Sequence, residues 1–196
     1  MTKTEIYNNI KYNENLVRQY QRTISSLQNK NSSLNSQING WNNQISSSNL
    51  RRSQLQSQIS ELTKLKIKYK ILQDNFASRQ SRRSNKLTLN FAQKANTFKF
   101  LSSYVIGMKS LLSGNEYKSA YNGLSAAMET IAKKVKTIQI EIDIITRDIS
   151  TLQSRINANQ NERRATQEKI NQTNGDLAYR QQRIVYWKNQ LSSATD

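Results

Sequence analysis

Three carboxylates lie close together in the sequence, at Glu141, Asp143 and Asp148. Paired carboxylates in an apolar setting can carry general acid–base chemistry. Here they alternate with isoleucines and have Lys136 and Arg147 as neighbours, so we interpret them as members of ion pairs on a helix surface. The chain contains no histidine and no cysteine, which excludes the usual zinc sites, catalytic triads and thiol chemistry. No glycine-rich phosphate loop or nucleophile elbow is present either. We therefore expect no enzyme, no cofactor and no metal.

Positive charge is the other chemical feature of the chain. The net charge is +17, from 30 Lys and Arg against 13 Asp and Glu, and from Lys64 to Lys99 ten basic residues are opposed only by Asp74. Such a surface can meet nucleic acid, an anionic membrane or an acidic protein, and a merely solvated face is an equally good reading. The nearby aromatic residues fall on an apolar stripe that we expect to be buried, so base stacking is disfavoured. The basic patch comprises Lys64, Lys66, Lys68, Lys70, Arg79, Arg82, Arg83 and Lys86.

The element that must present this patch is a long helix. Apolar residues recur in steps of three and four from Val17 to Phe76 without a change of phase, which predicts a helix that buries one narrow seam against another helix. The segment from Lys64 to Lys70 alternates in steps of two, but the heptad phase continues through it, so helix is predicted there as well. Thr2 and Glu5 form a candidate capping box at its start. One heptad position holds Val17, Ile24, Ile38, Ile45 and Ile59, and the other holds Tyr20, Leu27, Leu34, Trp41, Leu55, Leu62, Tyr69 and Phe76.

The apolar pattern then lapses and returns in a wider form. Residues 77–86 have almost no apolar side chains, so a bend or short break is expected there. The stripe that follows is too broad for one neighbour, which favours a small bundle or an intermolecular face over a helix on a membrane surface. The predicted partner-binding residues are Leu87, Phe91, Phe98, Leu101, Tyr104, Val105 and Met108.

A turn is predicted near residues 113–115. Gly114 can end one helix, and Ser113 with Glu116 fits the capping box of the next. From Tyr117 onward a second seam runs to the end of the chain. One of its positions holds Met128, Val135, Ile142, Ile149, Ile156, Ile170, Leu177, Ile184 and Leu191, and the other holds Leu124, Ile131, Ile138, Ile145, Leu152 and Trp187.

The predicted fold class is all-α: an elongated antiparallel helical hairpin or coiled coil with a central turn. Residues 1–78 form an amino-terminal coiled-coil helix, and residues 79–196 form a helical hairpin with a long carboxy-terminal helix. With the turn at 113–115, the last helix is too short to reach the first thirty residues, which would project with an unpaired seam. The alternative is a second helix folded back on the first, giving a three-helix head with a tail.

The region around Gly114 resembles a known family. Leu112-Ser113-Gly114, followed by Tyr117, Ala120 and Tyr121, is similar to the turn of the WXG superfamily of type VII secretion substrates. The whole layout resembles the α-helical partner proteins encoded beside LXG toxins in Gram-positive bacteria. The resemblance implies an adaptor that binds the helical export domain of a toxin and accompanies it to the type VII secretion machinery.

Two functions are therefore expected. The first is a helical adaptor whose partner is a toxin export domain or, failing that, a second copy of the chain. The second is a structural coiled coil whose basic face binds nucleic acid or an anionic surface. The amino terminus has no signal-peptide apolar region and no segment approaches the length of a membrane span. The expected location is the cytoplasm, with secretion by a signal-peptide-independent route as the alternative.

Overall fold

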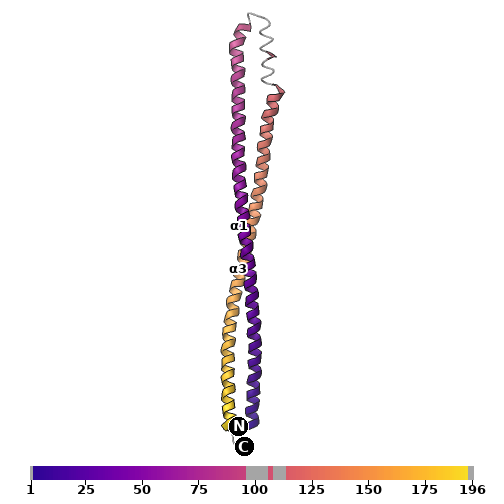
Figure 1. Ribbon diagram of the computed structural model, residues 1–196. Helices are drawn as coiled ribbons and strands as arrows, with labels where there is room; N and C mark the ends of the chain where they lie inside the picture. Colours follow the sequence, from indigo (N-terminus) through magenta and orange to yellow (C-terminus); the bar gives the residue numbers. More distant parts are fainter. Residues whose placement is uncertain (1, 96–105, 108–113, 194–196) are drawn as a thin grey trace. The chain divides into compact units, whose positions relative to one another are not determined.

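The computed structural model describes residues 2–95, 106–107 and 114–193, with the backbone alone for 87–95 and 115–116. Two long helices, α1 (Lys3–Ala95) and α3 (Asn115–Ser193), pack against each other as an all-α helical hairpin (Figure 1). At the start of α1, the Glu5 backbone N–H donates to Thr2 Oγ1 at 3.3 Å and the Thr2 nitrogen donates to Glu5 Oε2 at 2.8 Å. The predicted capping box is confirmed. No helix in these residues combines the length and apolar character needed to cross a membrane.

The chain divides into two compact units, each built from a stretch of α1 and a stretch of α3. The first unit contains Met1–Ser48 and Arg147–Asp196, and the second contains Asn49–Thr146. The boundary predicted at residues 78 and 79 falls inside α1, and that division of the chain stays a prediction.

In the first unit, the start of α1 lies beside the end of α3 (Figure 1). Lys188 Nζ lies 3.9 Å from Glu14 Oε1, and Arg180 donates to Asn13 Oδ1 at 3.4 Å. Further along, Asn31 donates to Gln167 at 3.2 Å. Residues later in α1 thus contact residues earlier in α3, so the two helices run antiparallel. The buried apolar side chains of this unit are Ile6, Ile10, Leu34, Ile38, Ile156 and Ile170.

The second unit is centred on Leu55, which is 1% exposed and clusters with Ile138 and Ile142. Gln73 is buried as well, and its amide nitrogen donates to Ser125 Oγ at 2.7 Å and to the Tyr121 carbonyl at 3.3 Å. A buried polar side chain with specific partners disfavours other registers, because a shift would leave it unsatisfied.

Both predicted seams are confirmed by burial. Every apolar residue assigned to them is buried or half-buried, except Phe76, which is 37% exposed. We number the heptad a to g, with Val17 at a and Tyr20 at d in α1, and Met128 at a and Leu124 at d in α3. In an antiparallel pair, positions g face each other on one side of the seam and positions e on the other. Ion pairs follow this rule: Lys30–Glu162 at 2.7 Å and Arg51–Glu141 at 2.9 Å join g to g.

Two predictions from the sequence are wrong. Residues 77–86 contain no break, because α1 is helical throughout Lys3–Ala95. Loss of apolar residues weakens the seam there, but Gln80 at position a and Ser84 at the adjoining position e remain half-buried, and the intervening residues are compatible with a helix. The amino-terminal thirty residues do not project with an unpaired seam either, since Ile6 is 3% and Ile10 is 7% exposed.

The second error comes from the assumed register. Phe76 stacks on Tyr117 with ring centroids 5.0 Å apart, so α1 already meets α3 there. The chain therefore reverses between Ala95 and Asn115, and α3 pairs with α1 back to its first turns. The helix start predicted after Gly114 agrees with α3 beginning at Asn115. Leu112 and Ser113 lie outside the described residues, as does the side chain of Glu116.

Candidate partner-binding surface

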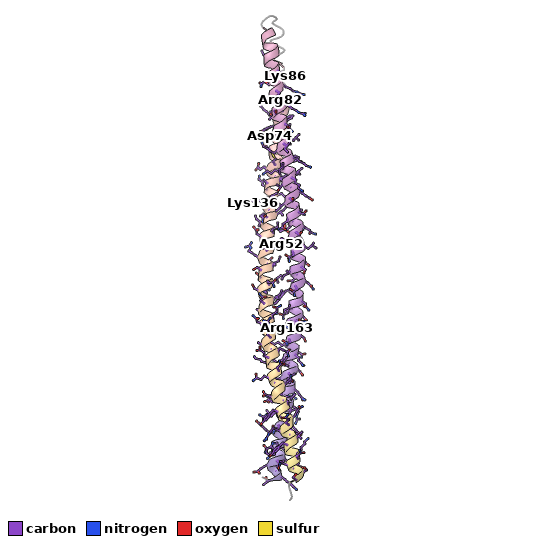
Figure 2. The ribbon with its side chains drawn as sticks, turned by 90° about the vertical axis from the view of Figure 1, so that its left-hand side faces the viewer. Arg52, Asp74, Arg82, Lys86, Lys136 and Arg163 are labelled. Atoms are coloured by element: carbon purple, nitrogen blue, oxygen red, sulfur yellow. The ribbon has the colours of Figure 1, made fainter. Side chains whose placement is uncertain are left out.

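The basic patch lies on α1 in the second unit, and all eight of its side chains are exposed. Figure 2 shows Arg82 and Lys86 extending from the helix. Lys70 Nζ pairs with Asp74 Oδ1 at 2.7 Å, and this hydrogen bond, with the attraction between the two charges, raises the pKa of Lys70. Within the described part of the chain, the other seven members make no ion pair. Apart from Lys70, the patch is thus a set of cations without an ion-pair partner among the described residues.

The g positions change character along the second unit. Arg51 and Glu141 form an ion pair across the seam, as expected for g positions in a two-helix coil. Two heptads nearer the chain reversal, and again one heptad further on, the facing g positions are apolar on both helices. They are Leu65 and Leu72 on α1, which are 38% and 53% exposed, and Ala120 and Ala127 on α3. We call this side of the second unit the g flank.

An apolar groove of about 460 Å³ opens on the g flank, and its walls carry almost no polar atoms. The small side chains of α3 create it, because Ala120 and Gly123 stand where larger residues would fill the space. A Cβ added at Gly123 would have nothing within 4 Å. The groove is lined by Leu72, Phe76, Ala120, Gly123 and Leu124.

An aromatic column borders this groove. Phe76 stacks on Tyr117, and Tyr117 stacks in turn on Tyr121 with centroids 6.1 Å apart. Both tyrosines belong to the predicted turn motif, and both are half-buried between the helices. They hold α1 and α3 together here, leaving one edge of Phe76 open to the groove.

The partner-binding residues predicted from the sequence, between Leu87 and Met108, differ from those that line the apolar groove. Phe98, Leu101, Tyr104, Val105 and Met108 lie outside the described residues, as do the side chains of Leu87 and Phe91. The heptad pattern of positions a and d does not predict the apolar groove, because Leu72 and Ala120 line it from g positions. The sequence does contain a pattern that indicates this groove. Two consecutive g positions of α1 are leucine, and the g positions that face them on α3 are alanine.

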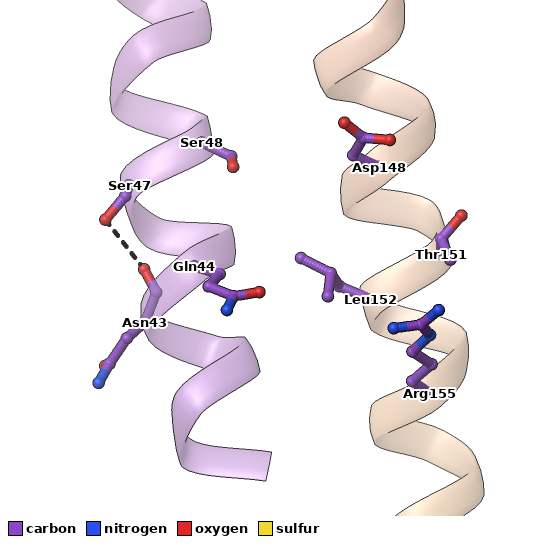
Figure 3. Close-up of a pocket in the computed structure, with 8 residues that line it drawn as sticks. All are labelled: Asn43, Gln44, Ser47, Ser48, Asp148, Thr151, Leu152 and Arg155. Carbon is purple, nitrogen blue, oxygen red and sulfur yellow. Dashed lines mark hydrogen bonds between the residues drawn. The ribbon is translucent and has the colours of Figure 1, made fainter. Parts of the chain in front are cut away.

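Other grooves in the described part of the chain are lined mainly by polar side chains. One of about 620 Å³ in the first unit lies between α1 and α3 (Figure 3). Seven of its eight lining residues are polar, and Ser47 is already engaged, donating to the Asn43 carbonyl at 3.1 Å. Asp148 and Arg155 also line it. Leu152 is the one apolar residue that lines this groove, so it offers a docked helix few apolar side chains to pack against.

Two of the three acidic residues singled out from the sequence have partners in the structure, and the third, Asp148, lines the groove of the first unit. Glu141 pairs with Arg51, and Asp143 accepts a hydrogen bond from Gln139 at 3.0 Å. Among the described residues, no three Asp, Glu, His or Cys side chains come close enough to hold a metal ion.

A second aromatic cluster lies where the helices end in the first unit. The Arg180 guanidinium lies 6.0 Å from the Tyr12 ring and 5.4 Å from the Tyr179 ring. Arg183 lies 5.0 Å from Tyr186 and 4.9 Å from Trp187. These cation–π contacts join α1 to α3 at Arg180 and explain how an arginine is accommodated at a seam position.

No family model matches the chain, and no curated protein or solved structure shows significant similarity to it.

Proposed function

We propose that this chain is a non-enzymatic helical adaptor that binds a helical segment of another protein. The observation that carries the proposal is the apolar g flank. A two-helix coil needs only a and d to be apolar, and widening that stripe onto g is typical of helices with a further neighbour. Leu65 and Leu72 gain little by facing water, and the groove between α1 and α3 has the concave shape that receives a helix.

The proposed partner is the helical export domain of a type VII-secreted toxin. This part rests on the resemblance of the region around Gly114 to the WXG superfamily turn. The adaptor role itself rests on the groove and does not depend on which protein supplies the helix.

A pair of adjacent substitutions tests the groove. Leu72 lies on the g flank and Ile71 on the outer face of α1, with exposed fractions of 53% and 55%. Burying the exposed part of Leu72 removes roughly 80 Å² from water, worth about 2 kcal/mol at ~25 cal/mol per Å². Because glutamine keeps part of that surface, Leu72→Gln should weaken partner binding about tenfold. Ile71→Gln, the control, should leave it unchanged.

The measurement is co-purification and titration of the full chain with the helical product of the neighbouring gene. Equal behaviour of the two variants would refute the groove as the binding surface. Since glutamine is a good helix former and both changes are neutral in charge, neither variant should lose helix content.

A second candidate function is binding of nucleic acid or another anionic surface through the basic patch. It is favoured by the seven exposed cations that have no ion-pair partner in the described residues. Its signature is an affinity for duplex and single-stranded DNA that falls steeply with salt and ignores sequence. DNA binding that persists at physiological salt, with no protein partner recovered, would favour this function over the adaptor.

A further inference from the structure

The groove carries information about the charge of its occupant. Positions c and g lie on the same side of a helix, so Lys68, Arg79, Arg82 and Lys86 share the g flank with Leu65 and Leu72. All four cations are exposed, and none makes an ion pair within the described residues. The g flank of α1 therefore presents an apolar stretch with Glu61 before it and uncompensated positive charge beside and after it, from Lys68 to Lys86.

The opposite side of the same unit differs. There Lys70 pairs with Asp74 at 2.7 Å, and on α3 Lys133 pairs with Glu129 at 2.8 Å on the outward positions. These two cations away from the g flank are thus balanced within one helix, at the i,i+4 spacing that suits solvent-exposed faces, whereas Lys64, Lys66 and Arg83 make no ion pair within the described residues. What distinguishes the g flank is that its uncompensated cations lie beside an apolar groove.

We infer that the groove receives a single amphipathic helix whose flanking residues are acidic. The inference rests on the proposed function and deepens it by specifying the chemistry of the partner. A helix lying along α1 from Leu65 to Lys86 would extend over about 32 Å, since each residue rises 1.5 Å. Its apolar side chains fill the space above Ala120 and Gly123, and its carboxylates face Arg79, Arg82 and Lys86.

Other occupants fit less well. A second copy of this chain would bring its own net charge of +17 against the same cations. A nucleic acid would neutralise the cations but would leave Leu65 and Leu72 without apolar contacts. An acidic amphipathic helix satisfies both features of the flank, because its apolar side sets affinity and its charge speeds association and orients the docked helix.

The test uses the full chain and three synthetic peptides of about six turns. Two share one apolar stripe and differ only in flanking residues, which are glutamate in one and lysine in the other. The third keeps the glutamates but has serine in place of the apolar stripe. At low salt, we expect the acidic amphipathic peptide to bind about tenfold more tightly than the basic one, since each exposed ion pair contributes little alone. We expect the serine peptide not to bind measurably.

Matched variants locate the effect. Arg79→Glu should weaken binding of the acidic amphipathic peptide severalfold. It should also reduce the difference in affinity between the acidic and the basic amphipathic peptide. Lys64→Glu makes the same change of charge at an exposed position on the outer face and should have a much smaller effect. Added salt should reduce the difference between these variants.

The outcomes separate this inference from the function on which it rests. Equal affinity for the acidic and basic amphipathic peptides, both weakened by Leu72→Gln, would overturn the inference and leave the adaptor intact. Equal binding of the serine peptide would overturn it in favour of a simple anion-binding surface. Self-association of the chain that competes with peptide would assign the groove to a second copy. Failure of every amphipathic helix and of the genuine partner to bind would overturn the adaptor as well.

Discussion

Replacing Leu55 with alanine is the sharpest test of the pairing between α1 and α3. Leu55 is 1% exposed and clusters with Ile138 and Ile142 across the seam. The change removes three buried carbon groups, worth about 2.4 kcal/mol at ~0.8 kcal/mol each. The cavity that remains adds to this loss, but a two-helix structure has solvent on both sides of the seam and can close part of the space. We therefore expect a loss of about 3 kcal/mol, near the lower end of the range for such changes.

Leu50 supplies a matched control on the same helix. It is 63% exposed and lies at position f, on the side of α1 away from the seam. Leu50→Ala removes the same atoms from a site already largely in water, and alanine is slightly the better helix former. Its effect on stability should stay within about 0.5 kcal/mol.

Urea unfolding followed by far-ultraviolet circular dichroism measures both variants. The slope of free energy with denaturant should be unchanged, so that the midpoint alone reports stability. Equal losses for Leu50→Ala and Leu55→Ala would refute the heptad assignment of α1 in the second unit. A loss below about 1 kcal/mol for Leu55→Ala would mean that this face is not packed as described.

Two further changes probe the seam and the outer surface. Gln73→Leu should leave stability unchanged or raise it by up to about 1 kcal/mol, because Ser125 still donates to the Tyr121 carbonyl, at 3.2 Å, and is not left without a partner. The substitution should instead reduce the specificity of the pairing, so that cross-linking detects more than one helix register. Gly40→Ala should stabilise the folded chain by about 1 kcal/mol in thermal unfolding, because a Cβ at this exposed helical position meets nothing within 4 Å. A loss of stability would mean that another chain covers Gly40.

Helix identity and the buried face of each helix could be predicted from the sequence because both depend on a local repeat. The phase from Val17 to Phe76 specifies which side of α1 is buried whatever it packs against. For the same reason the alternating segment from Lys64 to Lys70 was correctly predicted as helix. The phase of a seam does not say how far one helix has slid along the other, since any shift by a whole heptad superposes the same apolar positions.

The heptad pattern alone therefore does not predict the register between α1 and α3. Predicting it from the turn motif at Gly114 placed α3 too far along α1 and left the first thirty residues unpaired. The information was carried by polar residues instead. Gln73 finds Ser125 in this register, and Arg51 finds Glu141. Each is a specific pair that a shift of one heptad would break.

The same comparison of facing g positions leads to the candidate binding surface. Once Arg51 is known to face Glu141, a step of one heptad on each helix toward the chain reversal pairs Gln58 with Lys134, and the next step pairs Leu65 with Ala127. In a two-helix coil, position g usually holds an ion-pair partner. Here Leu65 contributes to an apolar surface instead, and the residue facing it, Ala127, is small. Both changes open the seam to one side, and each would cost solubility or packing without a third helix to cover them. The groove thus follows from the register, and an error in the register would move the expected binding surface along with it.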